Sequence, residues 1–149
     1  MLRVSKLTDY ATEVMAALAA APARVHSAQE LTERVRLELP TVSKLLKQLA
    51  SAGLIESFRG VNGGYRLARA PERISIADIV IAMEGPIGMT ECSAQAGSCD
   101  HESHCGVRVN WQRINQAIAG ALAGVSLADM IKPSPRRRVA SIPLRVVGA

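Results

Sequence analysis

The chain is predicted to be mainly α-helical, because apolar residues recur every three or four positions along most of it, as on one buried helix face. A first helix is predicted to end before Pro22, since proline cannot continue a helical turn. Its apolar positions are Leu7, Ala11, Val14 and Leu18. Three more apolar patterns each follow a serine with an acid three residues later, an arrangement that caps helix N-termini. The pairs are Ser27 with Glu30, Ser75 with Asp78, and Ser126 with Asp129.

Residues 39–53 carry one apolar face and one polar face. The apolar positions are Val42, Leu45, Leu46 and Leu49, and the opposite face offers Thr41, Ser43, Lys44, Lys47 and Gln48. Together with the helix that begins at Ser27 and a short turn at residues 37–40, this segment predicts a helix-turn-helix, whose second helix lies in the major groove of DNA. The same pattern is also typical of a solvated amphipathic helix, so the helix pair alone does not decide the function.

A β-hairpin is predicted directly after these helices. Residues 54–58 and 64–68 alternate like two short strands around a turn that begins at Arg59, and the glycines of the turn tolerate positive φ. Three helices followed by a hairpin are the element order of a winged helix. In that fold Arg59 can enter the minor groove while Lys44 and Lys47 meet base edges or phosphates in the major groove. The combination predicts binding of a double-stranded DNA operator. The alternative is that Arg59 only makes the loop soluble and contacts no DNA.

Residues 107–125 form the longest helical pattern, with apolar residues that alternate by three and four. These residues are Val107, Trp111, Ile114, Ile118, Leu122 and Val125. Small residues beside this apolar seam would let a second backbone approach closely, namely Ala117, Gly120, Ala121 and Gly124. We therefore expect a dimerisation helix and a homodimer, since a DNA-binding winged helix commonly uses two half-sites. The alternative is a helix that covers the core of its own domain.

Composition and charge support a nucleic-acid-binding domain. The 149 residues are 48% hydrophobic but only 3% aromatic, so aliphatic side chains must fill the core of about one domain. The net charge is +5, and eleven lysines and arginines stand against eight acids in residues 1–80, which favours a polyanionic partner. The longest apolar run, residues 14–21, is far shorter than the roughly 18 to 20 residues of a membrane span, and Asp9 and Glu13 argue against a signal peptide. We expect a cytoplasmic protein with no membrane partner.

All three cysteines lie close together in a segment whose glycines predict a loop. Cys92, Cys99 and Cys105 have the spacing Cys-x6-Cys-x5-Cys, and His101 and His104 stand between the last two. An odd number of thiols in a cytoplasmic protein indicates a metal site more than a disulfide. Three soft ligands with a fourth donor suit an iron–sulfur cluster or a tetrahedral zinc ion, and a redox-active group of thiols without metal is a third reading. The spacing does not choose among them.

Five segments carry a resemblance to known proteins. They are Ser5-Lys-Leu-Thr-Asp-Tyr10, Arg59-Gly-Val-Asn-Gly-Gly-Tyr65, residues 79–84, the three-cysteine loop and residues 127–130. Together they resemble the iron–sulfur-sensing winged-helix repressors typified by IscR and NsrR, and within these the regulators of the SUF iron–sulfur cluster assembly system. The resemblance implies a homodimer on palindromic operators, with a [2Fe–2S] or [4Fe–4S] cluster held by the three cysteines and repression released when the cluster is lost. A nitric-oxide-sensing repressor of the same fold and a zinc-structured DNA-binding regulator stay open as alternatives.

The fourth cluster ligand is where the chain departs from the pattern. IscR-like members carry a histidine ligand shortly after the third cysteine, but this chain has Arg108 at the matching place, and a guanidinium cannot ligate iron. NsrR-like members supply an amino-terminal aspartate from the opposite protomer, and Asp9 occupies the matching position. The resemblance thus implies Asp9 as the fourth ligand, with His101 and His104 as local alternatives.

The predicted fold is a mainly α winged helix-turn-helix with a small β-hairpin wing, a cysteine-bearing loop and a long dimerisation helix. The predicted units are a winged-helix DNA-binding domain at residues 1–84, a cluster-binding loop at 85–106, the dimerisation helix with a short C-terminal helix at 107–131, and a disordered basic tail at 132–149. No glycine-rich nucleotide loop, second cysteine cluster or acid–base pair is visible, so we do not expect an enzyme.

Overall fold

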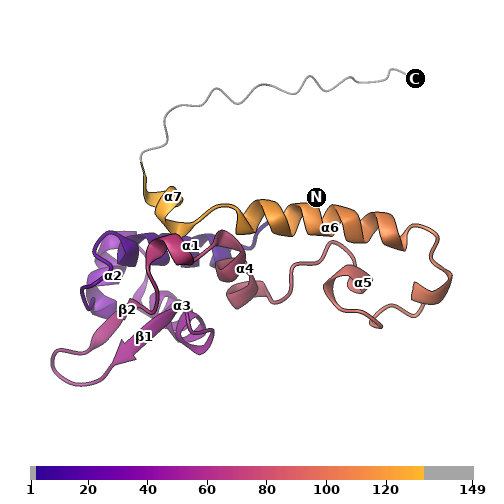
Figure 1. Ribbon diagram of the computed structural model, residues 1–149. Helices are drawn as coiled ribbons and strands as arrows, with labels where there is room; N and C mark the ends of the chain where they lie inside the picture. Colours follow the sequence, from indigo (N-terminus) through magenta and orange to yellow (C-terminus); the bar gives the residue numbers. More distant parts are fainter. Residues whose placement is uncertain (1–2, 133–149) are drawn as a thin grey trace, which may run out of the picture.

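The computed structural model describes residues 3–132 and is mainly helical (Figure 1). In chain order its elements are α1 (Lys6–Ala19), α2 (Ala28–Val35), α3 (Leu39–Ser51), β1 (Ile55–Phe58), β2 (Gly64–Leu67), the 3₁₀ helix η1 (Pro71–Arg73), α4 (Ile76–Glu84), α5 (Glu91–Ala94), the 3₁₀ helix η2 (Glu102–His104), α6 (Arg108–Ala123) and α7 (Leu127–Ile131). The predicted fold class is confirmed, since helices precede a hairpin wing and a long helix follows it. The predicted basic tail lies outside the described residues apart from Lys132. Within residues 3–132 no helix is long and apolar enough to cross a membrane.

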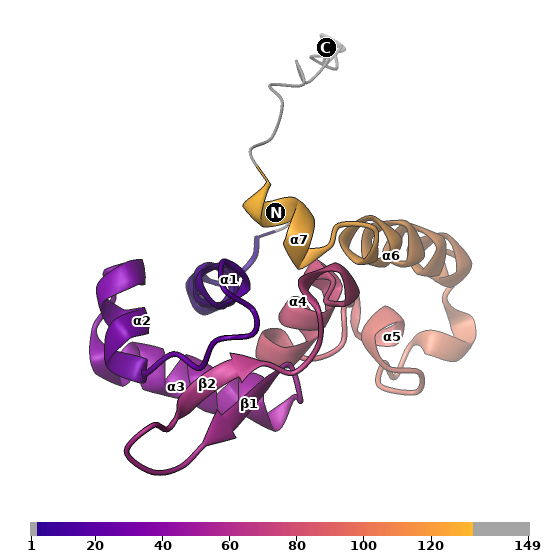
Figure 2. The same cartoon turned by 60° about the vertical axis from the view of Figure 1, so that its left-hand side comes forward.

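The elements form a winged-helix body and an arm that projects from it (Figure 1). The body contains α1 to α4, the hairpin and α7, and α1 is its centre because it packs against α2, α3, α4 and α7 (Figure 2). The arm is α6 with α5 packed beside it. The segment between α4 and α6, which carries the cysteines, therefore lies away from the hairpin.

An aliphatic core fills the body, as the composition predicts. Its fully buried side chains include Met15 and Leu18 of α1, Leu31 of α2, Leu45, Leu46 and Leu49 of α3, Ile79 of α4 and Leu127 of α7. Each such side chain contributes about 1.5–3 kcal/mol through burial. The Leu127 N–H donates to the Ile74 carbonyl at 2.7 Å, and the Ile76 N–H donates to the Val125 carbonyl at 2.9 Å. These two bonds tie the start of α7 to the start of α4 and so fix where α6 leaves the body.

Serine caps begin the helices where the sequence predicts them. The Ser27 hydroxyl accepts the Glu30 N–H at 3.1 Å, but the Glu30 carboxylate turns to His26 and Arg24 instead of back to the cap residue. A full capping box, in which the Glu30 carboxylate would also accept the backbone N–H of Ser27, does not form there because His26 and Arg24 hold the carboxylate. Complete capping boxes form at Ser75 with Asp78 and at Ser126 with Asp129.

The wing is a two-stranded antiparallel hairpin with an additional short bridge beside it. β1 and β2 pair with Phe58 opposite Gly64, as the alternation predicts. The backbone of His26 pairs with Tyr65 of β2, and both N–H···O distances are 2.8 Å. A Cβ on Gly64 would collide with the His26 carbonyl, so glycine is needed at this close approach. The sequence pattern gives no sign of this bridge between the turn before α2 and the wing.

The segment predicted to be a loop at residues 85–106 contains two short helices, α5 and η2. Cys92 lies in α5 and His104 lies in η2. The loop prediction is wrong at α5, because the Thr90 N–H donates to the Ser93 hydroxyl at 2.9 Å and supports one helical turn. The two helices are short enough that most of the segment still connects elements without regular structure.

Candidate nucleic-acid interface and cysteine loop

Helix α3 presents a polar face on the side opposite its buried residues. Val42, Leu45, Leu46 and Leu49 have no exposed surface. The residues Ser43, Lys44 and Lys47 are exposed, and Thr41 is half-buried. This division offers hydroxyl groups and two cations to a partner, which are the groups that read base edges and contact phosphates. The predicted polar face is present, and its contact with DNA stays a prediction.

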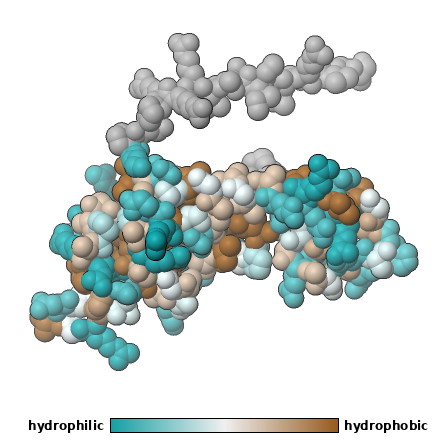
Figure 3. All heavy atoms as spheres, in the orientation of Figure 1, coloured by the Kyte–Doolittle hydropathy of each residue, from teal (hydrophilic) through white to brown (hydrophobic). Residues whose placement is uncertain are grey.

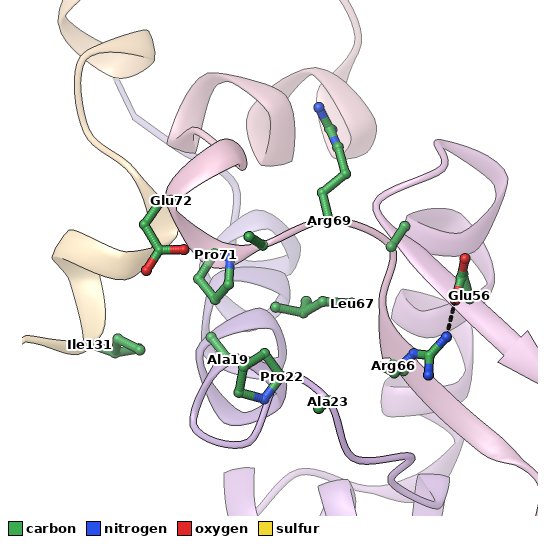
Figure 4. Close-up of a pocket in the computed structure, with 12 residues that line it drawn as sticks. Ala19, Pro22, Ala23, Glu56, Arg66, Leu67, Arg69, Pro71, Glu72 and Ile131 are labelled. Atoms are coloured by element: carbon green, nitrogen blue, oxygen red, sulfur yellow. Dashed lines mark hydrogen bonds and ion pairs between the residues drawn. The ribbon is translucent and has the colours of Figure 1, made fainter.

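The wing lies next to α3 at one edge of the body (Figure 2). Arg59 begins the turn between β1 and β2 and is exposed. Arg66, in contrast, is used within the wing, where it pairs with Glu56 at 2.8 Å and lies over the Phe58 ring at 5.0 Å from its centroid. Figure 4 shows the pair of Arg66 and Glu56 at the base of the hairpin. Of the two arginines in residues 55–67, Arg66 is thus held within the wing, and Arg59 is the exposed one.

Helix α6 leaves an apolar surface on its outer side. None of its residues is buried, although it is 16 residues long. Ile114 is 46% exposed and Trp111 is 37% exposed, which are high values for large apolar side chains on one helix. Further along the helix a Cβ on Gly120 would meet nothing within 4 Å, so the helix surface is open there as well. We call the surface around Ile114, Ala117 and Ala121, which lie within about 60° of one another around the helix axis, the outer face of α6.

The other half of the apolar seam belongs to a groove between α6 and the body. Ile118 and Leu122 line this groove together with Val80 of α4 and Met89. Figure 3 shows apolar surface gathered between the body and the cysteine segment. The seam that the sequence predicts as one surface is thus divided, because α4 and the segment after it occupy the inner side of α6.

The three cysteines lie on the cysteine loop, which we define as residues 85–106, beside the arm (Figure 1). All three are free thiols and half-buried, and the Cys92 Sγ is 3.3 Å from the Thr90 hydroxyl. Within residues 3–132, no group of three or more His, Cys, Asp or Glu side chains is arranged to hold a metal ion. Three free thiols on one loop are nevertheless a soft donor set whose chemistry fits an iron–sulfur cluster.

The candidate fourth ligands lie in different parts of the molecule. Asp9 is exposed in the first turn of α1, so it belongs to the body, and a single chain does not bring it to the cysteine loop (Figure 1). His101 and His104 are exposed on the loop itself. Arg108 forms an ion pair with Glu102 of η2 and so anchors the end of the loop. An anchoring role for Arg108 agrees with the expectation that it is not a ligand.

Asn115 of α6 holds the cysteine loop against the helix. Its amide nitrogen donates to the carbonyls of Ile87 at 3.0 Å and Ser93 at 3.4 Å. Its side-chain oxygen accepts the Met89 N–H at 3.2 Å. Asn115 has no role that the sequence pattern predicts, although a polar residue beside the apolar seam is a signal that could have drawn attention to it. These hydrogen bonds tie the first half of the loop to α6.

We expect Asn115→Ala to loosen the cysteine loop. The variant loses three hydrogen bonds, each worth roughly 0.5–1.5 kcal/mol, so the thiol of Cys92 should react about tenfold faster with iodoacetamide in the metal-free protein. Mass spectrometry of the modified peptide measures this rate. Gln116→Ala changes an exposed neighbour on the same helix and is the control. Its Cys92 should react at the wild-type rate. Equal rates in the two variants would contradict the role of Asn115.

Glu84, the last residue of α4, joins the start of the cysteine loop to the start of α1. Its Oε1 accepts the Thr8 hydroxyl and, at 2.8 Å, the Ser5 N–H. The hydrogen bond from the Thr8 hydroxyl is the main reason that the pKa of Glu84 lies below its ordinary value, and the hydrogen bond from the Ser5 N–H is the next. Since Asp9 lies in the same turn of α1, the position of that turn is linked to the point where the loop leaves α4.

The family of the chain follows from comparison with known proteins. The family model Rrf2, described as an iron-dependent transcriptional regulator, matches residues 4–133. The chain belongs to the Rrf2 family. Proteins of the Rrf2 family are transcriptional regulators and not enzymes, as the sequence predicts.

Individual Rrf2 relatives agree with this assignment. The chain is 36% identical over 102 residues to a helix-turn-helix transcriptional regulator of Neisseria meningitidis serogroup A, and the match covers 68% of each chain. Its fold is similar to that of CymR, the global cysteine regulator of B. subtilis, with a TM-score of 0.71, 28% identity, and coverage of 90% of this chain and 99% of CymR. It is also similar to IscR of T. potens, with a TM-score of 0.65, 31% identity, and coverage of 88% and 87%. The resemblance to IscR-type winged-helix regulators is thereby confirmed.

Proposed function

We propose that this Rrf2 regulator is a homodimeric repressor of SUF iron–sulfur cluster assembly genes whose affinity for its operator depends on an iron–sulfur cluster. The observation that carries the proposal is a loop with three free, half-buried thiols. This loop packs through α5 against α6, the helix that leads back to the body containing α3. Cys92, Cys99 and Cys105 would hold the cluster, which when bound supplies iron–thiolate bonds that oxidants can break. The match to a family of iron-dependent regulators supports iron over structural zinc.

The DNA contacts that we propose come from α3 and the wing. Thr41 and Ser43 offer hydroxyl groups to base edges in the major groove, whereas Lys44 and Lys47 reach phosphates or base edges. Arg59 enters the adjacent minor groove from the wing. The phosphate contacts give affinity for any sequence, and the base contacts select the operator.

The dimer that we propose forms through the outer face of α6. Two copies of this face would remove large apolar side chains from water and let the helices approach closely at their small residues. A two-fold dimer would fit a palindromic operator, because its two recognition helices would meet half-sites related by the same symmetry.

The link between the loop and DNA binding rests on two polar contacts. Asn115 ties the loop to α6, and Glu84 ties the start of the loop to the first turn of α1. A loop held in one conformation therefore fixes both the dimer helix and the body that carries α3. When the cluster is lost, the cysteine loop loosens. The winged-helix bodies of the two protomers then lose their fixed spacing, and repression ends.

Two measurements test this function. Anaerobic reconstitution followed by iron, sulfide and zinc analysis identifies the cofactor, and we expect iron and sulfide with little zinc. A gel shift on the DNA upstream of the SUF genes, with loaded and stripped protein, should show tighter binding by the loaded form. Zinc in place of iron, or the same operator affinity with and without the cluster, would overturn the proposal.

We expect Arg59→Ala to weaken operator binding by about 1–3 kcal/mol, because an arginine in a groove contributes about that much. Fluorescence anisotropy at matched salt measures the change, since phosphate contacts vary strongly with ionic strength. Arg73→Ala removes the same charge from an exposed position on η1 and is the control. If Arg59→Ala binds the operator as the Arg73→Ala control does, the wing does not enter a groove.

A further inference from the structure

An arginine stands at the end of the cysteine loop, where its charge does not favour the helix that follows. Arg108 is the first residue of α6, and no acidic residue lies in that first turn. A cation at a helix N-terminus is unfavourable, because the N–H groups there already carry partial positive charge. The position of Arg108 is therefore explained by the contacts of its guanidinium and not by the helix.

Glu102 fixes this guanidinium within the second half of the cysteine loop. Oε1 of Glu102 pairs with Nη2 of Arg108, and Oε2 accepts the Gly97 N–H at 2.6 Å. The Glu102 side chain is only 12% exposed, so both of its oxygens are held. The Glu102 N–H donates to the Cys99 carbonyl at 3.1 Å, and the Arg108 N–H donates to the Cys105 carbonyl at 3.3 Å. The pair thus spans the turn that these two cysteines enclose.

One donor of the guanidinium is left without an acceptor. Nε of Arg108 is buried, and within residues 3–132 no group accepts its N–H. The ion pair with Glu102 uses Nη2, at the end of the side chain, whereas Nε lies nearer the backbone. A buried donor without an acceptor is unfavourable, and a guanidinium does not remove it by giving up the proton. An acceptor bound in the cysteine loop would satisfy this donor.

The sulfur atoms of an iron–sulfur cluster are acceptors of this kind. Cluster sulfides and the thiolates that hold the cluster carry negative charge, and hydrogen bonds to these sulfurs are one of the factors that set the reduction potential. One-electron reduction adds a further negative charge. A cationic donor beside the sulfurs therefore stabilises the reduced form more than the oxidised form, which raises the potential.

We propose that Arg108, positioned by Glu102, donates its Nε hydrogen to a sulfur of the cluster and raises the reduction potential of the cluster. The inference rests on the proposed function, which places an iron–sulfur cluster at Cys92, Cys99 and Cys105. Arg108 is not a ligand in this arrangement, and Glu102 acts only through Arg108. The two residues together set how readily the cofactor gains or loses one electron.

Potentiometry of the loaded, full-length protein tests this role, with dithionite as the reductant and absorption spectra as the readout. Arg108→Met keeps an unbranched apolar stem but removes the donor and the charge. We expect its reduction to be about tenfold less favourable, which lowers the potential by about 59 mV for one electron. Arg73→Met removes the same charge from an exposed position on η1 and should keep the wild-type potential. A wild-type potential in Arg108→Met would overturn the inference.

Two further variants separate the hydrogen bond from the charges. Arg108→Met leaves Glu102 without its partner, and that unpaired charge alone would lower the potential. The double variant Arg108→Met and Glu102→Gln carries neither charge, and we expect its potential to stay below that of the wild type. A return to the wild-type potential in the double variant would assign the effect to Glu102 and overturn the hydrogen bond.

Arg108→Lys keeps the test decisive if the methionine variants do not fold. A lysine can retain the ion pair with Glu102, but its aliphatic stem has no donor where Nε stands. The lysine variant should therefore also have a lower potential than the wild type. A wild-type potential in Arg108→Lys would show that a positive charge is sufficient and would overturn the role of Nε.

Resonance Raman spectra detect the hydrogen bond itself. Exchange of N–H for N–D shifts the iron–sulfur stretching bands when the donor is bonded to a cluster sulfur. We expect a larger shift in the wild type than in Arg108→Met or Arg108→Lys. Equal shifts in the three proteins would contradict a bond from Arg108.

The outcomes distinguish this inference from the proposed function. If the potential falls in the Arg108 variants but operator affinity is the same with and without the cluster, the proposed repressor fails and the role of Arg108 stands. If the potential is the same in all variants, the role of Arg108 fails and cluster-dependent repression stands. A loop that takes up zinc in place of iron overturns both.

Discussion

Replacement of Ile114 by glutamate should separate the two protomers and remove specific operator binding. Ile114 is 46% exposed in the single chain and lies on the outer face of α6, where the proposed partner would cover it. A carboxylate without a partner in that contact costs about 3 kcal/mol or more, which raises the dimer dissociation constant about 100-fold or more. Sedimentation equilibrium measures the dimer, and anisotropy with operator DNA measures its consequence.

Gln116→Glu is the matched control for this substitution. It introduces the same group on the same helix, also at an exposed position, but two residues further on, which is about 200° around the helix axis. The control should remain a dimer with normal operator binding. A monomeric wild-type protein, or a dimer that tolerates glutamate at position 114 as well as at 116, would reject the outer face of α6 as the interface.

Ile118 is a poorer probe of the interface than its place in the apolar seam suggests. It lines the groove between α6 and the body, together with Leu122 and Met89, so a charge there would disturb the folding of its own chain. Loss of the dimer in such a variant would not show which contact failed. The division of the seam between an inner groove and an outer face is therefore what makes Ile114 the informative position.

Local patterns in the sequence predict most of the body. The period of α3, the serine caps and the hairpin around its glycines each depend on residues within a few positions of one another, and all three are found in the structure. The same patterns also place Ser43, Lys44 and Lys47 on the surface opposite the core. Such patterns describe which conformation a segment prefers by itself. In this fold the tertiary contacts stabilise the same conformation.

The contacts that connect separate segments are the ones that the sequence does not reveal. The pairing of His26 with Tyr65 uses backbone atoms, so no side-chain pattern marks it. Asn115 reaches residues more than twenty positions away, and Glu84 reaches the first turn of α1. The spacing of the three cysteines likewise does not reveal how the thiols lie in space, and among residues 3–132 they are not gathered into a group that could hold a metal ion.

Asp9→Ala should shorten the lifetime of the reconstituted cluster by about tenfold and weaken its control of DNA binding. Carboxylate oxygen is a harder and weaker partner for cluster iron than thiolate, so Asp9 would be the labile ligand and the cysteines would keep the cluster bound for a time without it. The fold itself should change little, because Asp9 is exposed and as an acid in the first turn of a helix contributes some tenths of a kcal/mol. Absorption spectra under anaerobic conditions measure the lifetime, with His104→Ala as the comparison.

A pair of mixed dimers tests whether Asp9 acts across the dimer. In the first, one chain carries Asp9→Ala and the other carries Cys99→Ser, so a ligand donated across the dimer leaves one complete site, made from the cysteines of the first chain and Asp9 of the second. In the second, one chain is wild type and the other carries both substitutions, which leaves the intact cysteines facing alanine. The two dimers have the same composition, and any difference between them comes from the arrangement of the ligands.

We expect a long-lived cluster in the first mixed dimer and a short-lived one in the second. The opposite result would mean that Asp9 serves the cysteines of its own chain, which would require α1 to leave its place in the body of the single chain. Equal lifetimes in the two dimers, together with a cluster lost in His104→Ala and kept in Asp9→Ala, would assign the fourth position to the loop histidine. In that case the cluster would be confined to one chain, and its loss would reach DNA only through the contacts of the loop with α6 and α4.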